Sequence, residues 1–324
     1  MNGLPVLRRG QHALVIAKVT VSAALLAVLF WRVDRPAFVH SLTAIPLPIV
    51  LGCILLYVGT YGLSTLRWRC LLRAANIQIS AGRIVVMYFE ASFFNLFLPT
   101  LIGGDVVRGV LVYRASQGRD AALPSVVLDR VAGMAAMLLL AISALSLGYE
   151  RLGDPHTAVL LTGTAAVFGS AVVLLFSSRA QSVVYRMLRR VGLSGVTAKL
   201  ESMGGALQRY ARYPWALAQA FGLSILLQGA VILTYALVGS GLKLTVPLLD
   251  YFVLVPLVTI VAMLPVSVAG LGVRESAAVY FFGKVGVDPA SALGMSLIWF
   301  SLTVLVSSVG GVLFAIDQHL LKRG

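Results

Sequence analysis

The chain has 324 residues, of which 59% are hydrophobic and only 12% are charged, with a net charge of +14. Soluble domains carry about 25% charged residues, and a soluble fold of this size could not cover so much apolar surface with a polar exterior. The composition therefore excludes a soluble enzyme. Nucleic acid is not an expected partner, because the basic residues cluster between apolar stretches, which is the usual orientation signal of membrane proteins.

Uncharged stretches long enough to cross a bilayer recur along the chain. A spanning helix needs about 20 largely apolar residues. The stretches that qualify are 36–66, 131–149, 155–178, 213–242, 251–273 and 289–316. A retained first helix over 13–31 also qualifies if Lys18 reaches the interface, and 84–104 is uncharged except for Glu90. We therefore predict an all-α polytopic membrane protein with about six full transmembrane helices.

Helix-breaking residues interrupt two of these stretches. They are Pro99, Gly103 and Gly104 in the first, and Pro265, Gly270 and Gly272 in the second. Proline and paired glycines break helices, and unravelled backbone at membrane depth survives only inside protein or beside water. We therefore predict two re-entrant helical hairpins, over residues 84–115 and 250–284.

The two hairpins share a spacing, since Pro99 precedes Arg108 by nine positions and Pro265 precedes Arg274 by nine. Paired broken segments in the two halves of a chain are typical of inverted-repeat transporters and mark their central site. The alternative is a chance similarity between two loops. We predict one membrane domain over 1–324. It comprises a first half over 1–178, a basic cytoplasmic connection over 179–212 and a second half over 213–324.

Lysine and arginine predict the orientation, because cytoplasmic loops carry an excess of them. The connection over 179–212 has seven basic residues against one acid, Glu201. A second basic region is formed by Arg67, Arg69, Arg73 and Arg83, and both termini are basic. We expect a multi-pass protein of the bacterial cytoplasmic membrane with both termini inside and hairpins that enter from opposite faces.

Ionisable residues inside apolar segments are costly and therefore functional candidates. Glu90, which shares a helix with Asn95, is predicted either to form a polar wall of a headgroup path or to pair with a nearby arginine. Asp105 either caps the next helix or pairs with Arg108 three residues later. The arginine fork of Arg108 suits bidentate recognition of phosphate. Because Asp129 and Arg130 stand at the head of a helix, we favour an interfacial anchor for them, with a site as the alternative.

The second broken segment carries Ser267, Arg274 and Glu275. A helix N-terminus beside an arginine favours a lipid phosphate. The alternative is an ion pair that only anchors the turn. The sequence has no phosphate loop for ATP and no nucleophile-elbow motif. No Cys/His spacing suggests a metal site. We therefore predict no catalytic residue, no cofactor and no metal.

Three segments together resemble a known family: Asn95 to Arg108, the pair Asp129-Arg130, and Leu264 to Glu275. They resemble the flippase-like transmembrane domain of the lysylphosphatidylglycerol synthases, and the resemblance spans most of the chain. In the full-length relatives, the multiple peptide resistance factors, this domain moves aminoacylated phosphatidylglycerol to the outer leaflet. A separate soluble synthase domain makes the lipid. These residues contain no such domain, so we expect a stand-alone form.

The resemblance implies a flippase or scramblase without its own ATPase, with Arg108 and Arg274 at the headgroup phosphate. The cargo would be an anionic or aminoacylated phospholipid, a hopanoid or a polyprenyl lipid. A separate lipid synthase and a second copy of the chain in a homo-oligomer are further partners that the resemblance leaves open. Two alternatives remain. One is a non-transporting partner of a lipid-modifying enzyme, and the other is an intramembrane transferase that uses Glu90 or Asp105 as base.

Overall fold

The computed structural model describes residues 20–29, 31, 45–97, 103–116 and 121–321, and every regular element within them is a helix. The prediction of an all-α polytopic membrane protein is confirmed. Five helices are long and apolar enough to cross a membrane. They are α3 (Leu47–Ala74), α6 (Ala122–Leu147), α8 (Pro155–Phe176), α11 (Pro214–Gly241) and α14 (Pro289–Leu321). The predicted first helix is described over Thr20–Leu29.

The starts of the long helices follow from their sequence. Pro155, Pro214 and Pro289 each stand at the first position of a helix, where the missing backbone N–H would have no intrahelical partner anyway. Beyond these starts the helices are apolar on nearly all sides, which is typical of membrane spans rather than of surface helices. Lipid offers no partners to backbone polar groups, so the segments close their hydrogen bonds internally as helices.

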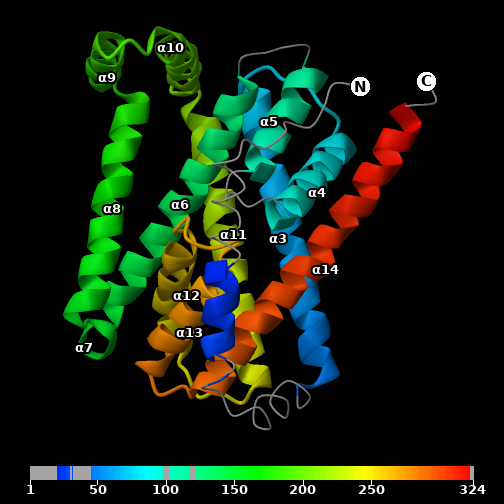
Figure 1. The fold of residues 1–324 in the computed structure, drawn as a ribbon, viewed down its shortest axis with the longest axis vertical. Coiled ribbons are helices and arrows are strands. Elements are labelled where there is room, and N and C mark those ends of the chain that lie inside the picture. Colours follow the sequence, from blue (N-terminus) through cyan, green and yellow to red (C-terminus); the bar gives the residue numbers. More distant parts are fainter. Residues whose placement is uncertain (1–19, 30, 32–44, 98–102, 117–120, 322–324) are drawn as a thin grey trace.

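The long helices form a bundle in which α3 packs along α11, and α6 packs on both α11 and α12 (Leu248–Ala262). Helix α14 crosses the bundle diagonally and packs on α4 (Ala81–Phe97). Other short helices include α5 (Gly103–Ala115), α7 (Tyr149–Leu152) and α13 (Val273–Gly283). Figure 1 shows α4 and α5 toward the end of the bundle that carries the C-terminus, and α12 and α13 toward the opposite end.

The two predicted hairpins correspond to two pairs of short, mutually packed helices, α4 with α5 and α12 with α13. Their lengths are 17, 13, 15 and 11 residues, below the roughly 20 residues that a full crossing needs. The uncharged stretch 251–273 is therefore a short helix and a turn rather than a full span. Pro99 lies outside the described residues. The re-entrant character of the pairs, their inverted-repeat relation and the exact number of crossings stay predictions.

The turn between α12 and α13 contains Pro265 and packs against the N-terminal helix. The backbone N–H of Val268 donates to Ser22 Oγ at 3.0 Å. Gly272 has a φ of +80° and begins α13, and a Cβ added there would lie 2.6 Å from Leu25 Cβ. The part of the turn from Ser267 to Gly272 is thus covered by protein, whereas Met263 to Val266 are exposed.

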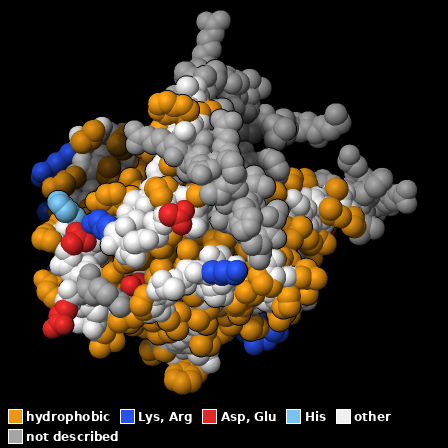
Figure 2. Space-filling view, turned by 90° about the horizontal axis from the view of Figure 1, so that it is seen from below, with side chains coloured by type: hydrophobic (Ala, Val, Ile, Leu, Met, Phe, Trp, Pro, Cys, Tyr) orange, Lys and Arg blue, Asp and Glu red, His pale blue; other side chains and the backbone are white. Residues whose placement is uncertain are grey.

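The basic connection is not a loop. Most of residues 179–212 belong to two further helices, α9 (Ser178–Arg190) and α10 (Ser194–Tyr210). These helices lie at the end of the bundle beyond α8 (Figure 1). Figure 2 views the opposite end, where the described acidic and basic side chains are scattered among apolar side chains. This contrast agrees with the predicted orientation, which places α9 and α10 inside and stays a prediction.

Asp154 joins the start of α8 to the end of α13. Its carboxylate accepts hydrogen bonds from the backbone N–H of His156 at 3.0 Å and from Lys284 Nζ at 3.0 Å. Burial raises the pKa of this carboxyl, but hydrogen bonds from Thr157 and Lys284 outweigh that effect and lower the pKa from 3.8 to about 2. The ionised carboxylate therefore stabilises the folded protein.

We expect this stabilisation to be present above pH 3.8 and to be lost as the pH falls toward about 2, because an acid whose pKa is lowered by folding favours the folded state only when ionised. Thermal unfolding in detergent between pH 5 and 2 measures the loss. Asp154→Asn should flatten this part of the curve, whereas Glu150→Gln, in the neighbouring turn, should not. An unchanged pH dependence in Asp154→Asn would contradict the assignment.

Candidate functional site

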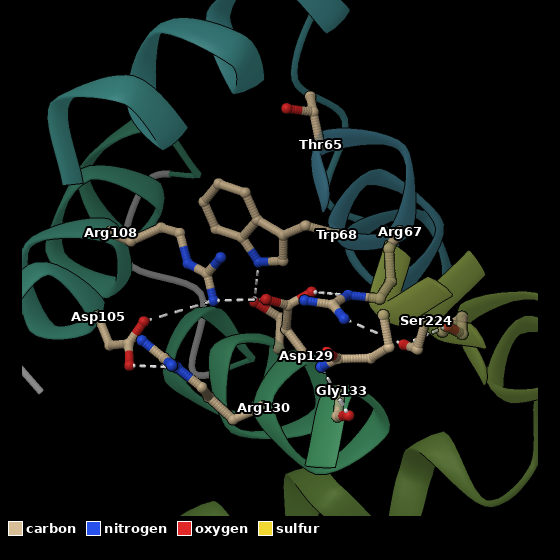
Figure 3. Close-up of polar contacts among 12 residues, drawn as sticks. Thr65, Arg67, Trp68, Asp105, Arg108, Asp129, Arg130, Gly133 and Ser224 are labelled. Carbon is tan, nitrogen blue, oxygen red and sulfur yellow. Dashed lines mark hydrogen bonds and ion pairs between the residues drawn. The ribbon is translucent and has the colours of Figure 1, made fainter. Parts of the chain in front are cut away.

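A chain of alternating charges lies where α3, α5 and α6 meet (Figure 3). It runs Arg67, Asp129, Arg108, Asp105, Arg130. Asp129 Oδ1 is 2.7 Å from Arg67 Nε, and its Oδ2 is 2.9 Å from Arg108 Nη2. Asp105 Oδ1 is 3.7 Å from Arg108 Nη2, and its Oδ2 is 2.7 Å from Arg130 Nε. We call these five residues the charge chain.

The inner part of the charge chain is almost completely shielded. Arg67, Arg108 and Asp129 are 5%, 2% and 1% exposed. Buried ions are tolerated only when they are paired and hydrogen-bonded, and Asp129 meets this condition by taking one guanidinium on each oxygen. Arg67 Nη1 also donates to Ser224 Oγ in α11 at 3.0 Å. Side chains from four helices thus hold the inner charges in place.

Aromatic rings fix the guanidinium of Arg108. Its Cζ lies 4.5 Å from the ring centroid of Trp68 and 5.0 Å from that of Tyr88, within the range of cation–π attraction. Trp68 is itself oriented by a hydrogen bond of 3.1 Å from its Nε1 to Ser125 Oγ. Arg108 Nε is buried and has no hydrogen-bond partner among the described residues. The rings and carboxylates therefore hold the guanidinium in place, while its Nε donor has no partner within the described residues.

A cavity of about 340 Å³ opens onto the charge chain. All five charged residues line it. Its polar wall continues over Tyr61, Ser64, Ser92, Asn95 and Gln228. Its apolar wall includes Met134, Met137, Leu227, Val231 and Trp299. Such a surface offers cations, neutral hydroxyl and amide groups and an apolar side to a single occupant.

A hydroxyl network closes one side of the cavity. Tyr61 Oη lies 2.5 Å from Ser92 Oγ and 3.1 Å from Ser307 Oγ, and the two serine hydroxyls are 2.7 Å apart. Tyr57 Oη donates to Thr303 Oγ1 at 2.9 Å. These contacts join α3, α4 and α14 without any net charge, so the positive charge of the site comes from the charge chain alone.

The structure brings the predicted residues of the first broken segment together. Asn95, Asp105, Arg108 and Arg130 line the same cavity as Asp129. Gly103 and Gly104 are buried at the start of α5, where the N–H of Gly104 donates to Asn95 Oδ1 at 2.8 Å. Asp105 pairs with Arg108, which was one of its two predicted roles, and more closely with Arg130.

Two predictions for single residues are wrong. Asp129 is not an interfacial anchor, because it is 1% exposed and is the central acid of the charge chain. Glu90 does not line the cavity, and it pairs with no arginine within the described part of the chain. It is fully buried, and both of its carboxyl oxygens lack a hydrogen-bond partner among the described residues.

The second broken segment forms a separate cluster. Arg274 Nη2 lies 2.9 Å from Glu275 Oε1, and Glu275 Oε2 accepts the N–H of Gly272 at 2.6 Å. Glu275 thus accepts the N–H of the N-cap residue of α13, at the helix N-terminus where the sequence predicted a phosphate. Arg274 stacks over Phe300 at 5.2 Å, whereas the preceding residue, Trp299, lines the cavity.

This second cluster therefore displays the ion pair that was the alternative reading of the sequence. Arg274 and Glu275 do not line the cavity. Ser267 is buried without a partner for its hydroxyl among the described residues, and Gly270 stands in the adjoining turn with a φ of +76°. A lipid-binding role for these residues stays a prediction.

Sequence reasoning missed Arg67, which it assigned to a cytoplasmic region. Helix α3 continues past Arg67 to Ala74, so this arginine is inside the bundle and not at its surface. A signal was present in the sequence. Successive intervals of four, three and three residues separate Tyr57, Tyr61, Ser64 and Arg67. This spacing places a polar stripe on one helix face.

No group of three or more His, Cys, Asp or Glu side chains in the described part of the chain could hold a metal ion. The five charges of the site pair with each other. Within the described residues the site therefore consists of guanidinium groups and carboxylates that neutralise each other in part.

Comparison with known proteins adds three findings. A family model described as the lysylphosphatidylglycerol synthase TM region matches residues 15–311. A UPF0104 membrane protein of Pyrococcus horikoshii is 21% identical over 335 residues, which cover 96% of this chain and 98% of that protein. Glycosyltransferase AglD of Haloferax volcanii is 24% identical over 339 residues, which cover 93% of this chain and 54% of that protein. The chain thus spans about half the length of the second relative.

Proposed function

Because this chain belongs to the family of lysylphosphatidylglycerol synthase transmembrane regions, we propose that it moves a lipid with a phosphate in its headgroup across the membrane, without an ATPase of its own. The single observation that carries the proposal is the charge chain on the wall of the cavity. The proposed cargo is an anionic or aminoacylated phospholipid, with a hopanoid or a polyprenyl lipid as the other classes to be compared.

The charge balance of the site favours an anion. Arg67, Arg108 and Arg130 face two acids, Asp105 and Asp129, so the charge chain carries one positive charge in excess. An uncompensated charge away from water is costly, and a phosphate in the cavity would offset it. Arginine forks match the geometry of phosphate oxygens.

Access to the charge chain is graded. The side chain of Arg130 is 48% exposed, that of Asp105 13% and that of Arg108 3%. An incoming phosphate would therefore meet Arg130 first and Arg108 deeper in. The cavity volume of about 340 Å³ lies at the lower end of the roughly 300–1,000 Å³ typical of small-ligand sites. This size suits a headgroup whose acyl chains stay in the bilayer.

The intramembrane transferase is less well supported. A general base must reach the proton it removes. Glu90 does not line the cavity, and both carboxylate oxygens of Asp105 are occupied by arginines. The alignment with the relative named as a glycosyltransferase covers only 54% of that protein. We therefore keep transport as the proposal and treat a partner role as an outcome of its test.

The test is lipid movement in reconstituted vesicles. Fluorescent phosphatidylglycerol and phosphatidylcholine are placed in both leaflets, and dithionite bleaching measures transfer from the inner leaflet. We expect the parent protein to move phosphatidylglycerol and Arg108→Lys to slow this by at least about tenfold, equivalent to ~1.4 kcal/mol. Lysine keeps the charge of Arg108 but loses its fork.

Arg83→Lys is the matched control, since Arg83 pairs with Asp317 through both guanidinium nitrogens but lies outside the cavity. It should move lipid at the parent rate. A folded Arg108→Lys or Arg108→Ala protein with the parent rate would show that Arg108 is structural. A parent protein that moves no lipid of any class would end the transport proposal in favour of a partner role.

A further inference from the structure

Helix α9 has an apolar stripe that points away from the rest of the protein. Apolar side chains recur at the spacing of one helix face, at Ala180, Val183, Val184, Met187, Leu188 and Val191. Val183, Met187 and Val191 are 46%, 60% and 74% exposed. In a helix that borders water the apolar face turns toward the protein core, and in α9 much of it faces outward.

The face of α9 that meets protein carries polar side chains beside the half-buried Val184 and Leu188. Gln181 is buried and receives a hydrogen bond of 2.9 Å from Gln208 Nε2 of α10. Tyr185 Oη donates to the carbonyl of Leu200 in α10 at 3.0 Å. The contact between the two helices thus includes these uncharged hydrogen bonds and the ion pair of Arg189 with Glu201. An apolar stripe that reaches the outward side of a helix held by such polar contacts is expected when the surroundings of the helix are lipid.

Arginines stand beside the apolar stripe. Arg179, Arg186 and Arg190 are exposed and lie on the helix face next to Val183. Arg189 stands on the far side and pairs with Glu201. An apolar face bordered by arginines is the pattern of a helix that lies in the headgroup region of an anionic leaflet.

The position of α9 supports the same surroundings. It begins after Ser177, which ends α8 and accepts a hydrogen bond from the N–H of Ala180. Only 6% of the apolar window of α8 is buried within the protein, so lipid must cover that helix almost completely. A helix that starts where such a span ends begins at the membrane surface (Figure 1).

We propose that α9 is an interfacial helix that binds an anionic lipid surface, with Val183, Met187 and Val191 among the acyl chains and Arg179, Arg186 and Arg190 at the lipid phosphates. Helix α10 holds it in this orientation through the contacts of Gln181 and Tyr185. The binding surface is separate from the cavity, and this inference does not depend on the proposed transport function.

Fluorescence quenching in nanodiscs tests the proposal on the full chain. A single cysteine, Met187→Cys, is introduced after Cys53 and Cys70 are replaced by alanine, and an environment-sensitive dye is attached. Ser182→Cys, which is exposed on the other side of the same helix, is the matched control. Quenchers on the acyl chains should reach the dye at 187 and not the dye at 182.

Varying the charge of the lipid tests the arginines separately from the apolar stripe. Quenching at 187 should be at least about twofold stronger in nanodiscs with phosphatidylglycerol than in phosphatidylcholine alone, and salt should reduce the difference by screening. The combined change Arg186→Gln and Arg190→Gln should abolish the difference. Equal quenching at 187 and 182 would overturn the proposal, as would cross-linking of two copies through residue 187 without lipid quenching.

Discussion

Replacing Asp129 with alanine is expected to destabilise the protein by about 3–5 kcal/mol, the cost of leaving a buried charge without its partner. Asp129 is the only carboxylate paired with Arg67 among the described residues, and it also takes Arg108 at 2.9 Å. Arg108 keeps Asp105 as a second acid. Arg67, whose side chain is 6% exposed, is therefore the arginine that the substitution leaves buried without an acid.

Thermal unfolding of the purified protein in detergent measures this effect. Asp317→Ala is the matched control, because it removes the acid from a two-point ion pair whose side chains are 33% and 24% exposed, and exposed pairs contribute only about 0–1 kcal/mol. The double variant Arg67→Met with Asp129→Leu should recover part of the stability, since both buried charges are removed together. Equal melting temperatures for Asp129→Ala and Asp317→Ala would contradict the paired cluster.

Replacing Gly310 with valine is expected to separate α14 from α4. A Cβ at Gly310 would lie 1.9 Å from the carbonyl oxygen of Phe89 and 2.4 Å from its carbonyl carbon. Both are backbone atoms and cannot rotate aside, so one helix must move. Overpacking of this kind costs about 1–3 kcal/mol or more, and the hydrogen bond between Ser92 and Ser307 would be lost with it.

Cross-linking reports this separation directly. With Ser92→Cys and Ser307→Cys in the cysteine-free protein, a short cross-linker should join α4 and α14 efficiently. Gly310→Val should reduce that yield severely and lower the melting temperature. Gly163→Val, at a glycine of α8 with nothing within 4 Å of an added Cβ, should leave both unchanged. Full cross-linking in Gly310→Val would show that the two helices do not pack as closely as described.

The sequence predicted the helical class because uncharged stretches of about 20 residues have few other uses. It also singled out Asn95, Asp105 and Arg108, which line the cavity, since polar and charged residues are rare and visible among apolar neighbours. It could not show that these residues share a cavity with Gln228, because that juxtaposition depends on how α11 packs on α6.

Arg67 was missed for a different reason. Basic residues that follow an apolar stretch normally mark its cytoplasmic end, and Arg67 stands close to Arg69 and Arg73. The helix end lies beyond all three, and Arg67 turns inward to pair with Asp129 of α6, on the face that the polar stripe of α3 marks. For Arg274 the sequence predicted more than the structure displays. Its spacing predicted a second phosphate site, whereas in the structure its guanidinium pairs with the neighbouring carboxylate of Glu275.

The order of residues in the charge chain has a consequence for biosynthesis. A growing chain presents Arg67 to the insertion machinery 62 residues before its acid, Asp129. Arg108 has Asp105 three residues earlier in the same helix and can enter the membrane as a nearly neutral pair. Arg67 has no such local partner, so its end of α3 should stay at the water interface until α6 is made. Completion of α6 would then draw Arg67 inward, and the arrival of Ser224 with α11 would be the last step.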